Sequence, residues 1–312
     1  MDLSVYEETC FPAVENARDP WCDDQRPVFD PRGGVLASAS EYSQYIRFFS
    51  ASGQHKRDIA CIARHVSYSP SGRFLLASSV GSVTVLRTDD ASVLYTLSGF
   101  PGPQYDEEVS IIAAFSPDEK LIAAGGCRGF VGVWDAAGGT LLHSLEFDFF
   151  EVTGIVFVGP GNRVAVSTRT GKLVLLDAGT GEILRRADAG TVCCASPDGK
   201  TLFLSPSECC MEVVIWDVET WSPRGSFSFP EGRSFQGMCV SPDGTLVAAG
   251  GTGGVILFSL PDMKPLWESS GLSTLYYETR SLAFSPDGCL LCAGTGAYLH
   301  LLSLRREPVP RV

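Results

Sequence analysis

Short apolar runs alternate with compact polar turns along the whole chain, and the turns repeat one pattern of residues. A typical copy is Phe284-Ser285-Pro286-Asp287-Gly288, in which an aromatic residue ends one run and a second run follows the glycine. Proline fixes φ at about −65°, aspartate accepts hydrogen bonds from nearby backbone amides, and glycine adopts the left-handed backbone that closes the turn. The pattern therefore predicts a hinge between two antiparallel strands.

Seven such hinges occur in the sequence, roughly 45 residues apart, which is typical of one supersecondary unit copied along the chain. They begin at Phe29, Tyr68, Phe115, Phe157, Ala195, Val240 and Phe284. A general prior of about 150 residues per domain would suggest two domains, but a repeated all-β unit outweighs it. We therefore expect a single domain over residues 1–312, and no segment shows a helical period.

The fourth unit shows most clearly how a repeat divides into strands. Apolar runs over residues 152–157, 163–168, 172–177 and 182–186 are separated by turns that contain glycine. The third run includes Leu173-Val174-Leu175-Leu176 and is apolar on both faces, as expected for a sheet that lies between two neighbouring sheets. The predicted fold class is all-β, a seven-bladed β-propeller of four-stranded antiparallel blades.

The last unit is one strand short. After the runs 289–293 and 298–304 the chain continues into a polar, proline-containing segment, which we interpret as a C-terminal tail over residues 305–312. Residues 3–11 form a short strand-like run that precedes the first hinge by too much to belong to its hairpin. We therefore expect the N-terminal strand to complete the last blade, because such closure removes an exposed sheet edge.

The chain resembles the WD-repeat β-propellers over essentially all 312 residues. The dipeptide that names the family stands at the end of the third strand as Trp134-Asp135 and Trp216-Asp217, with Leu176-Asp177 as a near match. Typical members also have a Gly-His pair before the first strand and an aspartate between the second and third strands. This chain has no Gly-His pair, and turns such as Arg128-Gly129 lack the aspartate. The resemblance implies a divergent member that acts as a non-enzymatic protein-interaction scaffold.

Composition and charge restrict the partner and the chemistry. The net charge of −12 disfavours nucleic acid and anionic membranes, and favours a protein or peptide partner with basic residues in a multiprotein complex. Most of the eleven cysteines lie in strand-like runs, and the adjacent pairs Cys193-Cys194 and Cys209-Cys210 lack the C-x-x-C spacing of a zinc site. We therefore expect reduced cysteines, no metal and no cofactor.

The candidate partner site lies on the end of the blades that carries the long loops. Because strands alternate in direction, the hinges lie at one end of each blade, here called the hinge end. The turns between second and third strands and the connections between blades lie at the other, here called the loop end. Aromatic and acidic residues alternate in these connections and could anchor a basic segment. The candidates are Phe100, Tyr105, Glu107, Glu108, Arg128, Phe149, Phe150, Arg233, Tyr276 and Tyr277. The alternative is that these aromatics pack beneath their own loops and the acids are merely solvated.

Two other functional classes remain as alternatives. Arg185-Arg186 is similar to the Arg-Arg-Gly signature of phosphoinositide-binding propellers, in which the arginines bind head-group phosphates, although Ala187 replaces the glycine here. Without that role, the two arginines belong to an exposed outer strand. A hydrolase or lactonase-like propeller would need a channel site. The four histidines are His55, His65, His143 and His300, and no G-x-S-x-G or H-E-x-x-H motif is present, so we expect no enzymatic activity.

The sequence also indicates a location for the protein. No apolar run approaches the ~18 residues that span a membrane, and the first residues lack a basic segment followed by an apolar one. We therefore expect a protein of the cytoplasm, with the nucleus as the alternative, that is neither secreted nor recruited to membranes.

Overall fold

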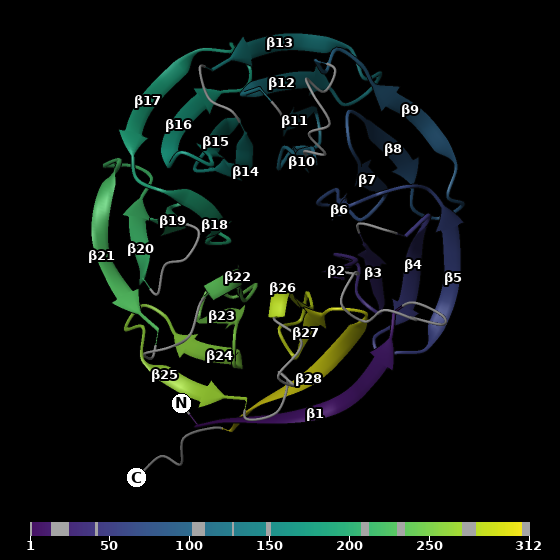
Figure 1. Cartoon of the computed structure of the whole chain (residues 1–312), viewed down its shortest axis with the longest axis vertical. Coiled ribbons are helices and arrows are strands. Elements are labelled where there is room, and N and C mark those ends of the chain that lie inside the picture. Colours follow the sequence, from purple (N-terminus) through teal and green to yellow (C-terminus); the bar gives the residue numbers. More distant parts are fainter. Residues whose placement is uncertain are drawn as a thin grey trace. The chain divides into compact units, whose positions relative to one another are not determined.

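The computed structural model describes most of the chain as β-strands and turns. The described residues are 2–13, 25–40, 43–101, 110–126, 128–147, 151–206, 212–229, 235–269 and 279–307. They form seven four-stranded antiparallel sheets and no helix (Figure 1). The predicted fold class, a seven-bladed β-propeller of four-stranded antiparallel blades, is confirmed. We call each sheet a blade and number the blades in chain order.

The blades belong to two compact units, which we describe separately. Unit 1 comprises residues 1–60 and 229–312 and holds blades 1, 6 and 7, whereas unit 2 comprises residues 61–228 and holds blades 2 to 5. The expectation of a single domain over residues 1–312 stays a prediction.

The strands of unit 2 follow one order in every blade, from the first, innermost strand to the fourth, outermost strand. Blade 2 contains β6 (His65–Tyr68), β7 (Phe74–Ser78), β8 (Val83–Arg87) and β9 (Val93–Leu97). Blade 3 contains β10 (Ile112–Phe115), β11 (Leu121–Gly125), β12 (Phe130–Asp135) and β13 (Leu141–Glu146). Blade 4 contains β14 (Val152–Val158), β15 (Arg163–Thr168), β16 (Lys172–Asp177) and β17 (Ile183–Asp188). Blade 5 contains β18 (Thr191–Ala195), β19 (Thr201–Ser205), β20 (Glu212–Asp217) and β21 (Ser222–Ser228).

Unit 1 repeats this arrangement and completes its last blade with the N-terminal strand. Blade 1 contains β2 (Arg26–Phe29), β3 (Val35–Ala39), β4 (Tyr45–Ser50) and β5 (His55–Ala60). Blade 6 contains β22 (Phe235–Val240), β23 (Leu246–Gly251), β24 (Gly254–Ser259) and β25 (Pro265–Glu268). Blade 7 contains β26 (Thr279–Phe284), β27 (Leu290–Thr295), β28 (Tyr298–Glu307) and, as its outer strand, β1 (Asp2–Pro12).

The predicted closure of blade 7 is confirmed, and it extends further than the sequence indicated. Antiparallel pairing between β1 and β28 places Val5 opposite Leu304 and Thr9 opposite Leu301. The ladder runs on to the pair Asp2 and Glu307. The tail that we expected from residue 305 therefore begins later, because β1 offers backbone partners to three more residues of β28.

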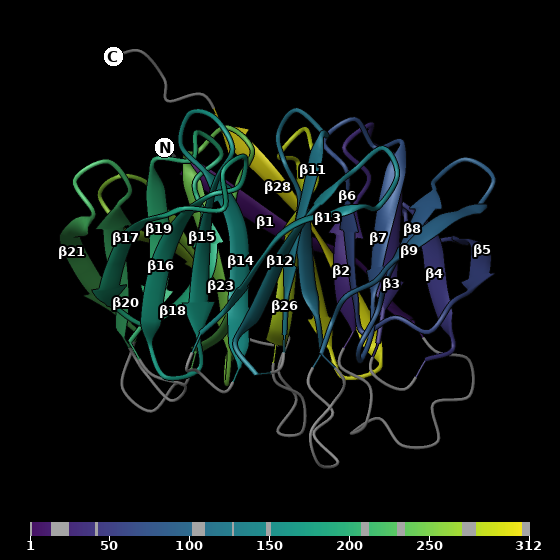
Figure 2. The same ribbon diagram turned by 90° about the horizontal axis from the view of Figure 1, so that it is seen from above.

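Burial explains why the inner strands read as apolar runs. All five residues of β11 and all six of β23 are buried, whereas the outer strands β13 and β17 are mostly exposed. In unit 2, apolar clusters fill the gaps between successive blades. The first strands of these blades contact each other, β10 with β14, and β14 with β18 (Figure 2). Blades 3 and 4 thus bury both faces of their inner strands against neighbouring blades of the unit.

The hinges close through side-chain hydrogen bonds that involve serine as well as aspartate. In blade 3, Ser116 Oγ donates to Asp118 Oδ1 (2.6 Å) and accepts from the Leu121 backbone N–H (2.9 Å). The hydrogen bond from Ser116 lowers the pKa of Asp118 below its usual value. The same contacts recur in the pairs Ser196 with Asp198, Ser241 with Asp243 and Ser285 with Asp287. The sequence analysis assigned this role to aspartate alone and missed the serine.

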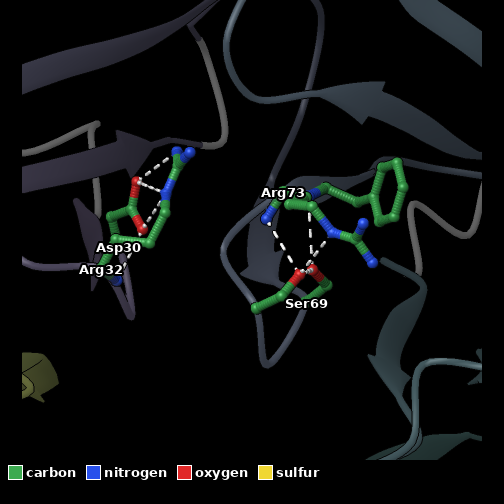
Figure 3. A network of polar contacts seen from close by, with 6 residues as sticks. Asp30, Arg32, Ser69 and Arg73 are labelled. Carbon is green, nitrogen blue, oxygen red and sulfur yellow. Dashed lines mark hydrogen bonds and ion pairs between the residues drawn. The ribbon is translucent and has the colours of Figure 1, made fainter.

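Blades 1 and 2 close their hinges with other residues, as Figure 3 shows. In blade 1 the buried Asp30 accepts from the Arg32 backbone N–H (2.9 Å) and from its guanidinium (2.8 Å). In blade 2, Ser69 Oγ accepts from the Phe74 backbone N–H (3.3 Å), while the Arg73 side chain donates to Ser71 Oγ (3.2 Å). In both hinges, these contacts are made by side chains of the turn itself.

One hinge residue links two blades of unit 2. Glu119 stands where most hinges have glycine and adopts a left-handed φ of 58°. Its carboxylate accepts a hydrogen bond from the Ser71 backbone N–H in the hinge of blade 2, and it lies 3.4 Å from Arg73 Nη2. Burial raises the pKa of Glu119, but the hydrogen bonds from Ser71, Ser69 and Arg73 together lower it below its usual value. Glu119 is thus held as a carboxylate between blades 2 and 3.

Candidate functional site

Two of the ten candidate partner residues fall within the described part of the chain, Phe100 and Arg128. The others lie outside the described residues and stay predictions: Tyr105, Glu107, Glu108, Phe149, Phe150, Arg233, Tyr276 and Tyr277. The geometry of the site is therefore built from the strand ends and short turns at the loop end of unit 2.

Phe100 lies just beyond β9 and packs onto the next blade. Its ring centroid is 4.9 Å from that of Trp134 and 5.7 Å from that of Phe130. Trp134 is fully buried, and its indole N–H donates to the Ser98 carbonyl (3.0 Å). Phe100 therefore covers a buried tryptophan, and a role as a partner anchor, which would use its outer surface, stays a prediction.

Gly132 makes room for this packing. It lies two residues before Trp134 on β12, so its missing side chain would point to the same face. A Cβ at this position would collide with the six-membered ring of Trp134. The gap between blades 2 and 3, here called the Trp134 gap, is filled at its loop end by Trp134, Phe130 and Phe100.

Arg128 lies in the turn between β11 and β12 and is exposed. Its φ of 59° is left-handed, a conformation that costs energy for a residue other than glycine. The following residue, Gly129, accepts a hydrogen bond through its carbonyl from the Phe147 N–H (3.1 Å). The turn is therefore fixed at the loop end of blade 3, and partner binding by Arg128 stays a prediction.

Arg185 and Arg186 are both exposed on β17, where they pair with Leu175 and Val174 respectively. Successive residues of a strand point to opposite faces, so the two guanidinium groups emerge on different sides of blade 4. No ion pair joins either arginine to a residue in the described ranges. Lipid binding by the pair stays an untested alternative, and opposite faces do not favour a single phosphate clamp.

A cleft of about 490 Å³ opens in unit 2 between blades 3 and 4. Its lining residues are Glu146, Phe147, Lys172, Leu173, Val174, Arg186, Ala187 and Asp188. They belong to the end of β13, the beginning of β16 and the end of β17, which places the cleft at the loop end. Its floor is apolar, because Phe147 and Val174 are buried and belong to the apolar cluster between blades 3 and 4.

Charged groups surround the mouth of this cleft. Lys172 forms an ion pair with Asp188, and both side chains are partly exposed. Glu146 is exposed, and within the described residues neither it nor Arg186 has an ion-pair partner. A rim of mixed charge over an apolar floor is typical of a site that recognises both an apolar group and a nearby charge.

We did not predict this cleft from the sequence, although the third strands of blades 3 and 4 carry a signal for it. Leu176 and Trp134 hold the same place on the third strands of their blades, each directly before an aspartate. Two residues earlier, Val174 stands where β12 has Gly132, and four residues earlier Lys172 stands where it has Phe130. Reading these positions side by side predicts that the gap between blades 3 and 4, here called the Leu176 gap, lacks the rings of the Trp134 gap.

Two features of the described ranges bear on catalytic chemistry, the metal-ligating side chains and the cysteine thiols. They hold no cluster of three His, Cys, Asp or Glu side chains that could bind a metal ion. Burial raises the pKa of Cys193 to about 12 and also raises the pKa values of Cys239 and Cys292, so these thiols are protonated at neutral pH. None of these three cysteines therefore supplies a thiolate nucleophile.

All four histidines lie in strands. His143 Nε2 lies 2.9 Å from the Gly179 carbonyl, across the Leu176 gap, and His300 Nε2 lies 2.9 Å from Thr295 Oγ1. His55 is the first residue of β5 and contacts Asp58 (2.7 Å). His65 is the first residue of β6.

No helix within the described ranges is long and apolar enough to span a membrane.

Comparison with known proteins gives two matches. A family model described as "WD domain, G-beta repeat" matches residues 92–135, from β9 to the Trp134-Asp135 dipeptide. The chain is also 29% identical over 137 residues to WD repeat-containing protein 82 of Drosophila melanogaster. That match covers 39% of this chain and 41% of the Drosophila protein. The segment that carries Phe100, Phe130 and Trp134 thus lies within the matched repeat.

Proposed function

Because the chain is a WD-repeat β-propeller, we propose that it is a non-enzymatic scaffold that docks a partner peptide or protein on the loop end of its blades. The observation that carries the proposal is the match of residues 92–135 to the WD repeat, since proteins of this family typically serve as protein-interaction scaffolds. The partner segment carries basic residues, and the complex contains several proteins.

The two ends of the blades support the choice of surface. At the hinge end, serine and aspartate side chains occupy the backbone groups of the turns, as Ser241 and Asp243 do in blade 6. At the loop end, the connections 98–111 and 269–278 are much longer than the hinges. Rigid strands that hold long loops lower the ordering cost of association, which favours the loop end for binding.

Charge supports the choice of partner. The chain has 36 acidic and 24 basic residues, so its average field attracts a cationic segment and raises the rate of encounter. Glu107 and Glu108 lie in one of the long connections and would contribute to that field. The interaction should therefore weaken as salt concentration rises.

Affinity purification of the tagged chain followed by mass spectrometry tests the proposal. We expect a reproducible set of co-purifying proteins that is lost when Tyr105, Phe149 and Tyr277 are replaced together by alanine. Lys200→Ala is the matched control, because Lys200 is exposed at a hinge and should leave the set unchanged. Circular dichroism of each variant checks that the fold is retained.

Two outcomes would contradict the proposal. An unchanged set of partners with the triple variant would remove the loop end as the binding surface. Flotation of the chain with phosphoinositide vesicles, abolished by Arg185→Ala or Arg186→Ala, would instead support membrane recruitment.

A further inference from the structure

The cleft of the Leu176 gap occupies a place that aromatic rings fill in the neighbouring gap. In the Trp134 gap, the indole of Trp134 lies over Gly132, and Phe100 and Phe130 pack against it. In the Leu176 gap, the corresponding positions of blade 4 hold Leu176, Val174 and Lys172, none of which carries a ring. The apolar clusters assign Trp134 to the face towards blade 2 and Leu176 to the face towards blade 3, so the two gaps are directly comparable.

The Ser98 carbonyl, which accepts the hydrogen bond of the Trp134 indole, has a counterpart in blade 3. Trp134 donates to the carbonyl of Ser98, the residue that follows β9. Leu97 pairs with Val83 in blade 2 as Leu145 pairs with Val131 in blade 3, so Leu97 and Leu145 are equivalent. The next residues, Ser98 and Glu146, are therefore equivalent too. Glu146 lines the cleft, so acceptor oxygens lie where an inserted ring N–H would need them.

A basic group faces the same space. Arg186 lines the cleft, pairs across the ladder with Val174 and has no ion-pair partner among the residues described. The guanidinium forms bidentate hydrogen bonds with carboxylates, and such charge-assisted bonds are stronger than neutral ones. An acidic side chain next to the inserted ring would therefore find its partner at the rim.

We propose that this cleft is a docking pocket for an aromatic side chain of a partner protein, flanked in that partner by an acidic residue. The ring enters the space beside Val174 and Phe147, and the neighbouring carboxylate pairs with Arg186. The cleft of about 490 Å³ lies within the usual range of binding pockets, roughly 300 to 1,000 Å³. The proposal rests on the proposed scaffold function and adds one specific motif to it.

The test uses the purified full chain and a displayed library of short random peptides. We expect the enriched peptides to share an aromatic residue next to aspartate or glutamate. Binding of a synthetic enriched peptide, followed by fluorescence anisotropy, should weaken roughly tenfold or more with Arg186→Ala, which removes a charge-assisted hydrogen bond. Arg185→Ala is the matched control, because its side chain emerges on the opposite face of β17 and should leave the affinity unchanged.

A second variant closes the cleft without removing a charge. The double substitution Val174→Gly with Leu176→Trp copies the Gly132 and Trp134 arrangement of blade 3 into blade 4, where the new indole should fill the space. We expect this variant to keep its thermal midpoint and to lose peptide binding. If the variant does not fold, Arg186→Ala and Arg185→Ala still decide the question.

The outcomes separate this proposal from the scaffold function. Any one of three results would overturn the proposed pocket. The native chain enriches no peptide, the enriched peptides lack an aromatic residue, or the peptide binds the native chain and Arg186→Ala with equal affinity. Equal loss with Arg185→Ala and Arg186→Ala would also overturn it, because both arginines would then act as one general basic surface. The scaffold function fails independently, when affinity purification recovers no partner.

Discussion

The two faces of blade 3 border gaps that are built from the same strands and filled in different ways. On the face towards blade 2, Trp134 is fully buried, its N–H is satisfied and Phe100 covers it. Towards blade 4, Leu176 is equally buried but leaves a cleft above Val174. The difference teaches that a repeated blade can create a pocket by changing three side chains of its third strand, with no change of backbone register.

The two gaps also differ in the contacts that link their neighbouring blades. Glu119 joins the hinge of blade 3 to that of blade 2, whereas the corresponding position of the blade 4 hinge is Gly161, which has no side chain to reach blade 3. Across the Trp134 gap, Tyr95 donates its hydroxyl to the Ala136 carbonyl, and across the Leu176 gap His143 contacts the Gly179 carbonyl. Both gaps thus have a contact between the turn after one third strand and the preceding blade, but only the Trp134 gap adds, among the contacts described, the Glu119 link at the hinge end and the Trp134 to Ser98 hydrogen bond at the loop end.

The largest expected effect comes from removing the tryptophan. Trp134→Ala should lower the free energy of unfolding by about 3–5 kcal/mol, since it deletes a buried aromatic side chain and leaves a cavity. Leu176→Ala should cost about 2 kcal/mol, at the low end for such changes, because water from the adjoining cleft can enter the space. Urea denaturation of both variants measures the difference, and equal losses would show that the two gaps are packed alike.

A smaller effect should follow from adding one methyl group to the Trp134 gap. Gly132→Ala should destabilise the chain by about 1–3 kcal/mol, because the new Cβ collides with the ring of Trp134. Gly225→Ala is the matched control, since no atom lies within 4 Å of its added Cβ. Thermal unfolding checks both variants. A neutral Gly132→Ala would mean that the indole can move and that the gap is not tightly filled.

Replacement of Glu119 tests the contact between the hinges of blades 2 and 3. Glu119→Ala should destabilise the chain by about 1–2 kcal/mol, since it removes the acceptor for the Ser71 N–H and keeps the left-handed backbone. Glu119→Gly should cost roughly 1 kcal/mol less than Glu119→Ala, because glycine adopts a φ of 58° without strain. Chemical denaturation of the two variants separates the loss of the hydrogen bond from the cost of the left-handed backbone. Equal losses of unfolding free energy in the two variants would show that the backbone at position 119 is not strained.

The smallest expected effect is the pH dependence of the contribution of Glu119 to stability. The pKa of Glu119 is lower in the folded chain than its usual value of 4.5, so its contribution is fully present above that value. It is lost as pH falls through the lower folded pKa, because the folded state must then bind the proton that breaks its contacts. The stability difference between the native chain and Glu119→Gln should therefore shrink between neutral pH and about pH 3. Denaturation at both values measures it, and a constant difference would show that the carboxylate is not titrating there.

The fold was predictable because its information is local and repeated. Tyr68, Phe115, Ala195, Val240 and Phe284 each end the first strand of their blade, as the turn pattern required. The hinge chemistry acts within five residues, so a single sequence shows it. The pairing of β1 with β28 was predictable for another reason, since the last unit lacked a strand and residues 3–11 had no other place.

The candidate site was predictable only in part. Proline and glycine mark turns, but no local signal shows that Val174 and Leu176 leave a space, because the cleft depends on Glu146 and Phe147 from another blade. Phe100 illustrates the same point, since its sequence position indicated a loop and its contacts connect it to Trp134. Residues that act across a gap can be recognised in the sequence only after the blades have been aligned with one another.

The pairing of β1 with β28 also bears on how the chain is made. Ser4 and Arg305 are ladder partners although almost the whole chain separates them. Of the strands described, β1 is synthesised before all the others, but it can enter its sheet only after β28 has been made. During synthesis the apolar side chains of β1 must be shielded by other means, so nascent unit 1 should depend on chaperones more than nascent unit 2, whose strands pair only with strands close to them in sequence.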